Sequence, residues 1–199
     1  MTQPLIKKDK IYTYQDYLSW DEDVRYELID GVAYALAAPL QIHQIIHREV
    51  SYNITGFLKG KKCMLLYAPS SVKLNASELN DTVFEPDLFV VCDRSKLDGR
   101  TYNGVPDLII EITSPSTARI DKVYKFHKYL QAGVKEYWII EPDIGSISVF
   151  VLENNNYTAF VYENTDKVPS KVLDGLVINM AEVFAEIEFL EKDSGNQYN

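Results

Sequence analysis

The segment from Pro106 to Thr117 constrains the fold of this chain more than any other. Residues 108–112 read Leu-Ile-Ile-Glu-Ile, a nearly continuous apolar run that is typical of a β-strand covered on both faces. Glu111 interrupts this run. An ionised carboxylate inside a core strand is costly unless a metal ion or a cationic side chain compensates it. Glu111 is therefore the first candidate for a functional residue.

The composition describes an acidic globular protein. The chain has 199 residues and a net charge of −9, which argues against a broad basic surface that coats nucleic acid but leaves room for a local basic groove. We expect one domain over residues 1–199, with residues 1–11 and 194–199 flexible. No apolar run has the length of a membrane span, and the polar N-terminus resembles no signal segment, so we expect a cytoplasmic protein. Cys63 and Cys92 are interpreted as buried thiols in a reducing compartment, neither a disulfide nor a metal pair.

The pattern of apolar residues and turn signals predicts an α+β fold. Helices are expected at residues 13–20, 40–58, 118–131 and 181–191, with Thr13 and either Ser116 or Thr117 as N-caps. Strands are expected at residues 25–29, 32–36, 63–67, 72–74, 83–91, 108–112, 136–141, 146–152, 157–162 and 173–178. Residues 75–81 and 93–104 are expected to be loops.

Two Pro-Asp pairs compete for a place beside Glu111. Asp107 lies four residues earlier on the same strand, about 13 Å away, which is too far for one small cation to bridge. Asp87 lies on a different strand, and neighbouring strands are only about 5 Å apart. Oxygen ligands of this kind suit Mg²⁺ or Mn²⁺. Taken alone, Asp87 could equally be a turn residue that follows Pro86.

A lysine is missing from the position where a nuclease would need one. Position 113 faces the same side of the strand as Glu111, but it holds Thr113. The helix that follows offers three lysines, of which Lys125 is spaced to pair with Asp121. On spacing alone this pair reads as a weak, solvated surface interaction. The alternative is that the lysine turns back over the metal site; the three lysines are Lys122, Lys125 and Lys128.

Two N-terminal features are candidates for an accessory role. Glu27 is either a further carboxylate of the site or a solvent-facing residue of a hairpin. His43 stands near the start of the long helix, where most histidines are caps or packing residues. His47 lies one turn later, and a zinc pair with His43 lacks a recognisable third ligand.

These residues together resemble the Uma-type endonuclease family of the PD-(D/E)XK, restriction-endonuclease-like superfamily. The resemblance runs from about Tyr12 to Phe184 and is most specific between Pro106 and Trp138. It rests on Tyr26-Glu27-Leu28-Ile29-Asp30-Gly31, His43, Glu85-Pro86-Asp87, the segment 106–117, Asp121 with Lys125 and Tyr129, and Gly133-Val134-Lys135-Glu136-Tyr137-Trp138.

The resemblance implies a mixed central sheet flanked by helices, with an additional antiparallel meander, and a metal-dependent phosphodiesterase. It implies that Asp87, Glu111 and the backbone carbonyl of Ile112 hold Mg²⁺ or Mn²⁺. Lys125 then replaces the lysine that is absent at Thr113. Glu27, His43, Thr113 and Asp121 are possible accessory residues.

We therefore expect an endonuclease that hydrolyses nucleic acid, with DNA as the first candidate. Because two sites are needed to cut both strands of a duplex, the resemblance also suggests a homodimer. The alternative is a binding module that retains the nuclease fold with weak or no activity, which the acidic charge favours.

Overall fold

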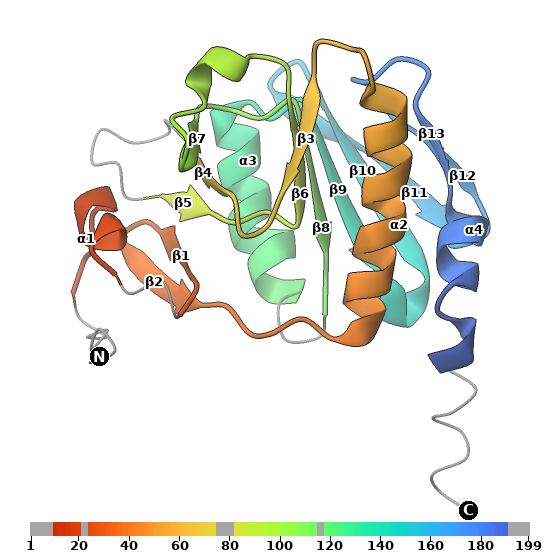
Figure 1. Cartoon of the computed structure of the whole chain (residues 1–199), viewed down its shortest axis with the longest axis horizontal. Helices are drawn as coiled ribbons and strands as arrows, with labels where there is room; N and C mark the ends of the chain where they lie inside the picture. The colour runs from red at the N-terminus through yellow and green to blue at the C-terminus, as the bar shows by residue number, and fades with distance from the viewer. Residues whose placement is uncertain (1–9, 21–23, 75–81, 115–117, 191–199) are drawn as a thin grey trace, which may run out of the picture.

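The computed structural model describes residues 10–20, 24–74, 82–114 and 118–190 (Figure 1). Its centre is a six-stranded mixed sheet in the order β11-β10-β9-β8-β6-β3. In this sheet β8 pairs parallel with β9, and the other neighbours are antiparallel. The strands are β3 (Met64–Tyr67), β6 (Leu88–Val91), β8 (Leu108–Ile112), β9 (Glu136–Glu141), β10 (Ser146–Glu153) and β11 (Asn156–Glu163).

A five-stranded sheet in the order β2-β1-β5-β4-β7 packs beside the central one. Its first two strands form the predicted hairpin, and Asp30 and Gly31 both have the positive φ that a tight hairpin turn requires. Its strands are β1 (Tyr26–Ile29), β2 (Val32–Ala35), β4 (Ser71–Lys73), β5 (Val83–Phe84) and β7 (Thr101–Asn103). A small third sheet pairs β12 (Lys167–Pro169) with β13 (Val177–Asn179).

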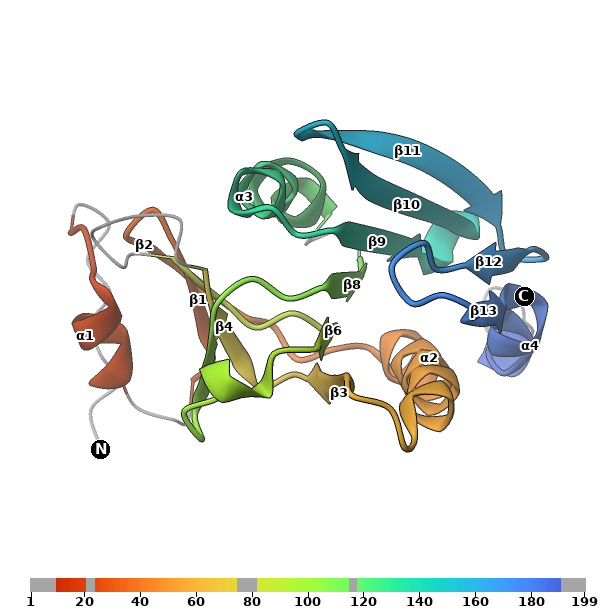
Figure 2. The same cartoon turned by 90° about the horizontal axis from the view of Figure 1, so that it is seen from above.

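Helices cover both faces of the central sheet (Figure 2). Helix α2 (Gln41–Leu58) lies on one face, next to α4 (Met180–Ala185) and the β12–β13 pair. Helix α3 (Phe126–Ala132) lies on the opposite face and continues a π-helical segment, Ile120–Lys125. The short helix α1 (Tyr14–Leu18) begins at Thr13, which forms the predicted N-cap. In the described part of the chain, no helix is both long and apolar enough to cross a membrane.

The pleat of β8 sorts its side chains between two cores. Leu108, Ile110 and Ile112 pack in the core under α2, whereas Ile109 packs with Tyr129 of α3 on the other face. All five residues of β8 are buried, as a strand covered on both faces must be. Because side chains alternate along a strand, Glu111 shares the α3 face with Ile109.

The strand predicted over residues 83–91 is in fact two strands in two different sheets. It breaks at Glu85-Pro86-Asp87, where Pro86 has no N–H to give to a ladder. Strand β5 joins the five-stranded sheet and β6 joins the central one. The break leaves Asp87 at the entrance to β6, next to Leu88, rather than within a continuous strand.

Other element boundaries also differ from the prediction. The expected loop 93–104 contains a 3₁₀ turn, Arg94–Lys96, and strand β7, which pairs in parallel with β4. The last predicted strand lies later in the chain, as β13, and β12 was not predicted. A further 3₁₀ turn, Pro142–Ile144, separates β9 from β10. The predicted loop 75–81, the N-cap at Ser116 or Thr117, and the termini 1–9 and 194–199 lie outside the described residues.

The prediction of two free thiols is wrong, because Cys63 and Cys92 form a disulfide. The pairing of β3 with β6 sets Met64 opposite Val91, so the residues just outside this pair face each other. Their Cα atoms are 4.0 Å apart. Sequence spacing hides this contact because it depends on the register of the two strands.

We expect the disulfide to contribute about 3.5 kcal/mol to the free energy of unfolding, because it closes a loop in the unfolded chain. Its cysteines are 29 residues apart. Urea denaturation with and without a thiol reductant measures this difference. A double Cys63→Ser, Cys92→Ser variant should be insensitive to the reductant. Two reactive thiols in the native, air-exposed protein would contradict the prediction.

Candidate active site

The structure brings Asp87 and Glu111 together at the same end of two neighbouring strands of the central sheet. Strands β6 and β8 are antiparallel with Leu88 opposite Ile110, so Asp87 stands opposite Glu111. The backbone N–H of Asp87 donates to Glu111 Oε2 at 3.3 Å. The carboxylate of Asp87 in turn accepts the N–H of Ile112 at 2.8 Å on Oδ2. Each carboxylate thus accepts a hydrogen bond from the backbone of the segment that carries the other.

The ammonium of Lys125 lies at the centre of a buried cluster of carboxylates. Its Nζ is 2.9 Å from Oε1 of Glu111, 2.9 Å from Oε1 of Glu27 and 3.2 Å from Oδ1 of Asp121. Lys125 and its three partners are each between 1% and 4% exposed. The reading of Lys125 and Asp121 as a solvated surface pair is therefore wrong. A lysine ammonium has three N–H donors, and three carboxylates surround this one.

The π-helical segment explains how Asp121 and Lys125 reach the same point. A π-helix is wider than an α-helix, and such segments occur frequently at functional sites. Here the N–H of Phe126 bonds the carbonyl of Asp121, five residues earlier. The hydroxyl of Tyr137 donates to that same carbonyl at 3.1 Å. The segment thereby turns Asp121 and Lys125 inward, toward Glu111.

The other candidates on these elements have different partners. Lys122 pairs with Glu141 at 2.5 Å, and Lys128 pairs with Asp30. Of the three lysines offered by the predicted helix, only Lys125 contacts Glu111. Asp107 lies at the far end of β8, where it accepts the N–H of Cys92 at 2.8 Å.

Glu27 belongs to the cluster and is not a solvent-facing hairpin residue. It comes from β1 of the five-stranded sheet, and its Oε1 also accepts the backbone N–H of Glu85 at 3.0 Å. The hydroxyl of Tyr129 donates to Glu111 Oε1 at 3.0 Å. Tyr129 was part of the family pattern, but the sequence assigned it no role.

Two histidines of α2, the helix on the face of the sheet opposite α3, contact Asp87. His43 Nε2 is 3.0 Å from Oδ2 of the Asp87 carboxylate, and His47 Nε2 is 3.0 Å from the Asp87 carbonyl oxygen. Because a carbonyl oxygen only accepts hydrogen bonds, Nε2 is the ring nitrogen of His47 that carries a hydrogen and donates it. The two rings are stacked, with an interplanar angle of 15°. From the sequence, His47 was a candidate only for a zinc pair with His43. The one-turn spacing of the two histidines was the sign that they act together.

Ile112 and Thr113 follow Glu111 at the end of β8. The N–H of Ile112 donates to the carboxylate of Asp87, and the N–H of Thr113 donates to the Ile140 carbonyl at 2.8 Å. Thr113 is buried, and its side chain makes none of the contacts that bind the cluster together. Lys125 therefore stands alone as the cation beside Glu111 among the described residues.

The family model described as Uma2, putative restriction endonuclease, matches residues 14–181. The chain belongs to this family. An uncharacterized protein of Synechocystis, slr1290, is 24% identical over 161 residues, which span 79% of this chain and 83% of the relative. The crystal structure of a putative nuclease belonging to DUF820 from Anabaena variabilis superposes with a TM-score of 0.74 at 20% identity, covering 88% of this chain and 98% of the other. The fold of this Uma2-family chain is restriction-endonuclease-like, as the sequence predicted.

Burial and like charges set the protonation of the cluster. Burial raises the pKa of Glu111 well above its ordinary value; Lys125 opposes this, and Asp121, Asp87 and Glu27 add to it. Burial also raises the pKa of Glu27, against the attraction of Lys125. For Lys125, burial favours the neutral amine, but the three carboxylates outweigh it and raise the pKa well above its ordinary value.

Asp87 titrates in the opposite direction. Burial acts to raise its pKa, but the hydrogen bond and charge of His43, the N–H of Ile112 and the charge of Lys125 together lower it. The cluster thus pairs a carboxyl that is readily ionised, Asp87, with one that resists ionisation, Glu111. A second cation beside Glu111 would remove that resistance, because it would compensate the excess of negative charge.

The donor set suits a hydrated, oxygen-liganded cation. Among the described residues, no three His, Cys, Asp or Glu side chains are grouped so that they could hold a metal ion alone. Mg²⁺ does not require such a cage, because it keeps several waters and binds through one or two carboxylates. Asp87 uses Oδ2 for His43 and Ile112, and its Oδ1 makes no hydrogen bond to a described residue. Asp87 and Glu111 therefore fit this kind of ion.

Glu136 shows what a purely structural buried glutamate looks like in the same sheet. It is fully buried at the start of β9, and its oxygens accept four hydrogen bonds and contact no cation among the described residues. Its donors are the indole of Trp138, the hydroxyl of Ser170 and the N–H groups of Lys171 and Val172. Glu136 fastens the segment before β13 to the central sheet, whereas Glu111 faces other carboxylates.

The raised pKa of Glu111 predicts how stability depends on pH. Below its ordinary pKa of 4.5 this group is protonated in both the folded and the unfolded chain. As the pH rises toward the raised folded pKa, the unfolded chain loses its proton first, so stability falls by up to about 1.4 kcal/mol per pH unit. Urea unfolding in EDTA should show this fall in the wild type relative to Glu111→Gln. A difference that does not change between pH 4.5 and 8 would contradict the raised pKa.

Proposed function

We propose that this chain is a metal-dependent nuclease that hydrolyses the phosphodiester bonds of nucleic acid, with DNA as the first substrate to test. The observation that carries the proposal is the contact of Lys125 Nζ with Glu111 at 2.9 Å, directly beside Asp87. One carboxylate from each of two neighbouring strands and one lysine from the next helix meet at one point. Family membership supports the same reading, since the family is described as putative restriction endonucleases.

Asp87 and Glu111 would hold Mg²⁺ or Mn²⁺, and the Ile112 carbonyl is the third ligand that we propose. Such an ion, when bound, supplies a water of lowered pKa and neutralises charge on the phosphate. The protein keeps Asp87 ionised through His43, which is the state that a ligand must have. Tyr129 fixes Glu111 by donating to Oε1, which leaves Oε2 on the side of Asp87.

Lys125 supplies a fixed positive charge next to the reacting phosphate. Glu27 and Asp121 hold its ammonium in place and keep it protonated. A cation that is already oriented in a buried site stabilises the negative charge that develops as water attacks phosphorus. Because carboxylates surround its three N–H donors, Lys125 reaches the phosphate or the attacking water only by releasing one of them. Glu111 is the partner that a metal would draw away.

We expect Asp87→Asn and Glu111→Gln to lower the rate of Mg²⁺-dependent DNA cleavage by at least 10³-fold at saturating DNA, because each removes a proposed ligand. Calorimetry with Mn²⁺ should show loss of binding in both variants. Asp107→Asn is a matched control, since it alters the other Pro-Asp pair at the far end of the sheet and should bind Mn²⁺ as the wild type does.

Two outcomes would contradict the proposal in different ways. Cleavage that survives both substitutions would show that another site acts. Absence of Mn²⁺ binding and of cleavage in the wild type would favour the alternative of an inactive binding module that retained the nuclease fold.

His43 and His47 position Asp87, so their loss should weaken metal binding without removing a ligand. We expect His43→Ala to lower Mn²⁺ affinity by about 10-fold, the usual effect of removing a partner that orients a ligand. His43→Gln should restore most of the affinity, because a glutamine amide can donate where Nε2 does. His127→Ala changes the remaining, exposed histidine and serves as the control. Equal affinity for all four proteins would show that α2 does not orient Asp87.

A further inference from the structure

A basic hollow lies at the end of the central sheet opposite the candidate site. It consists of two adjoining depressions of about 290 and 350 Å³ that share Lys62, Cys92 and Asp93. Five basic side chains and two carboxylates line it. The basic residues are Lys61, Lys62, Arg94, Lys96 and Lys135, and the carboxylates are Asp93 and Asp107. This local excess of positive charge stands out on a chain whose net charge is −9.

Both carboxylates of the hollow are already engaged. Asp107 pairs with Lys135 at 2.7 Å and accepts the N–H of Cys92. Asp93 accepts both the N–H and the hydroxyl of Ser95, and it lies 3.7 Å from Lys96. The hollow therefore contains more positive charge than its own carboxylates can balance.

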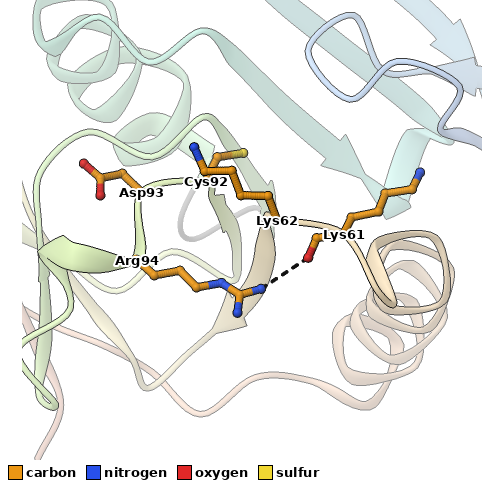
Figure 3. A pocket seen from close by; sticks show the side chains of 5 residues that line it. All are labelled: Lys61, Lys62, Cys92, Asp93 and Arg94. Atoms are coloured by element: carbon orange, nitrogen blue, oxygen red, sulfur yellow. Dashed lines mark hydrogen bonds between the residues drawn. The ribbon is translucent and has the colours of Figure 1, made fainter.

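Lys62 and Arg94 provide that remaining positive charge. No carboxylate of the described residues lies within ion-pair distance of either side chain. Figure 3 shows Lys62 extending past Cys92, while Arg94 donates to the backbone carbonyl of Lys61 at 3.4 Å. The ammonium of Lys61 points away from both, over the ring of Phe57. Lys62 and Arg94 are exposed, so an anion can approach both.

The disulfide fixes the two segments that bear these cations. Cys63 directly follows Lys62, and Cys92 comes two residues before Arg94. The bond therefore joins the end of the segment after α2 to the start of the segment after β6. Two cations from distant parts of the sequence are held on one surface by a covalent link.

The hollow and the candidate site lie along the same strand. Asp87 precedes β6 and Cys92 follows it, so at the rise of a β-strand the two are about 16 Å apart. One nucleic-acid strand advances about 3.4 Å per nucleotide along the helix axis. Because β6 itself is buried, a nucleic-acid backbone must follow the surface around it, so it needs at least about five further nucleotides to reach the hollow from the candidate site.

We propose that the basic hollow binds backbone phosphates of the nucleic acid whose scissile bond lies at Asp87 and Glu111. This inference rests on the proposed function. Spaced, solvated cations suit a polyanion, and Lys62 and Arg94 are exposed, whereas Lys125, the cation of the carboxylate cluster, is buried and surrounded by carboxylates. Free phosphate or a mononucleotide shares this chemistry, so the test must separate the polymer from the small anions.

The test compares Lys62→Glu/Arg94→Glu with Lys167→Glu/Lys171→Glu, a pair of exposed lysines that gives the same change in charge. Fluorescence anisotropy in EDTA measures the affinity for DNA duplexes of 6 and 24 base pairs. We expect the first pair to weaken binding of the long duplex at least 10-fold and to reduce the slope of log affinity against log salt by about 2. The control pair should change affinity less than 2-fold, and the short duplex should respond less than the long one.

Equal losses in the two pairs, or an unchanged salt slope, would overturn the proposal. A milder pair, Lys62→Gln/Arg94→Gln, keeps the test valid if charge reversal prevents folding. Competition of the long duplex by millimolar phosphate or mononucleotide as efficiently as by DNA would assign the hollow to small anions instead. The measurements distinguish failure of the proposed nuclease function from failure of the proposed phosphate-binding role of the hollow. Glu111→Gln should abolish cleavage and retain the long-duplex affinity, whereas loss of the hollow should weaken binding and leave cleavage measurable at saturating DNA.

Discussion

The contact between the Lys125 ammonium and its three carboxylates is the interaction on which the candidate site depends. Glu27, Glu111 and Asp121 come from a strand of the five-stranded sheet, a strand of the central sheet and a π-helical segment. One cation therefore ties together three elements that are distant in the sequence. Burial strengthens each of these attractions and also makes any unpaired charge costly. The cluster cannot lose its lysine without leaving acidic side chains facing each other.

The two helices on opposite faces of the sheet play different parts. Helix α3 and its π-helical segment bring a charge to Glu111, whereas α2 supports Asp87 through two histidine rings. His43 helps to lower the pKa of Asp87, whereas burial and the neighbouring carboxylates raise the pKa of Glu111 despite the charge of Lys125. Such divergence between neighbouring carboxyl groups is typical of catalytic sites, and it also occurs in structural networks. Glu136, whose four donors satisfy it completely, shows the structural case within the same sheet.

Strand β6 links the candidate site to the basic hollow, and its neighbour β8 runs beside it. The acidic cluster precedes β6, and the disulfide with its basic neighbours follows it. In the two proposals, this separation assigns metal binding to the acidic end of the strand and backbone-phosphate binding to the basic end. The scissile phosphate would lie with the metal at the acidic end, and phosphates further along the backbone would lie at the basic end. The acidic net charge is therefore compatible with nucleic acid as a substrate.

The sequence by itself determined the buried strand at residues 108–112, the anomaly of Glu111, the hairpin at Asp30-Gly31 and the family, because these depend on local pattern. Tertiary structure decided the features that residue spacing cannot predict, namely strand register, burial and side-chain partners. Register alone sets Cys63 opposite Cys92, and Pro86 divides one apolar run between two sheets. Asp121 and Lys125 carry the same spacing as a surface pair, yet the π-helical segment buries them. Burial and partners, which make Glu111 differ from Glu136, arise only when distant strands and helices pack together.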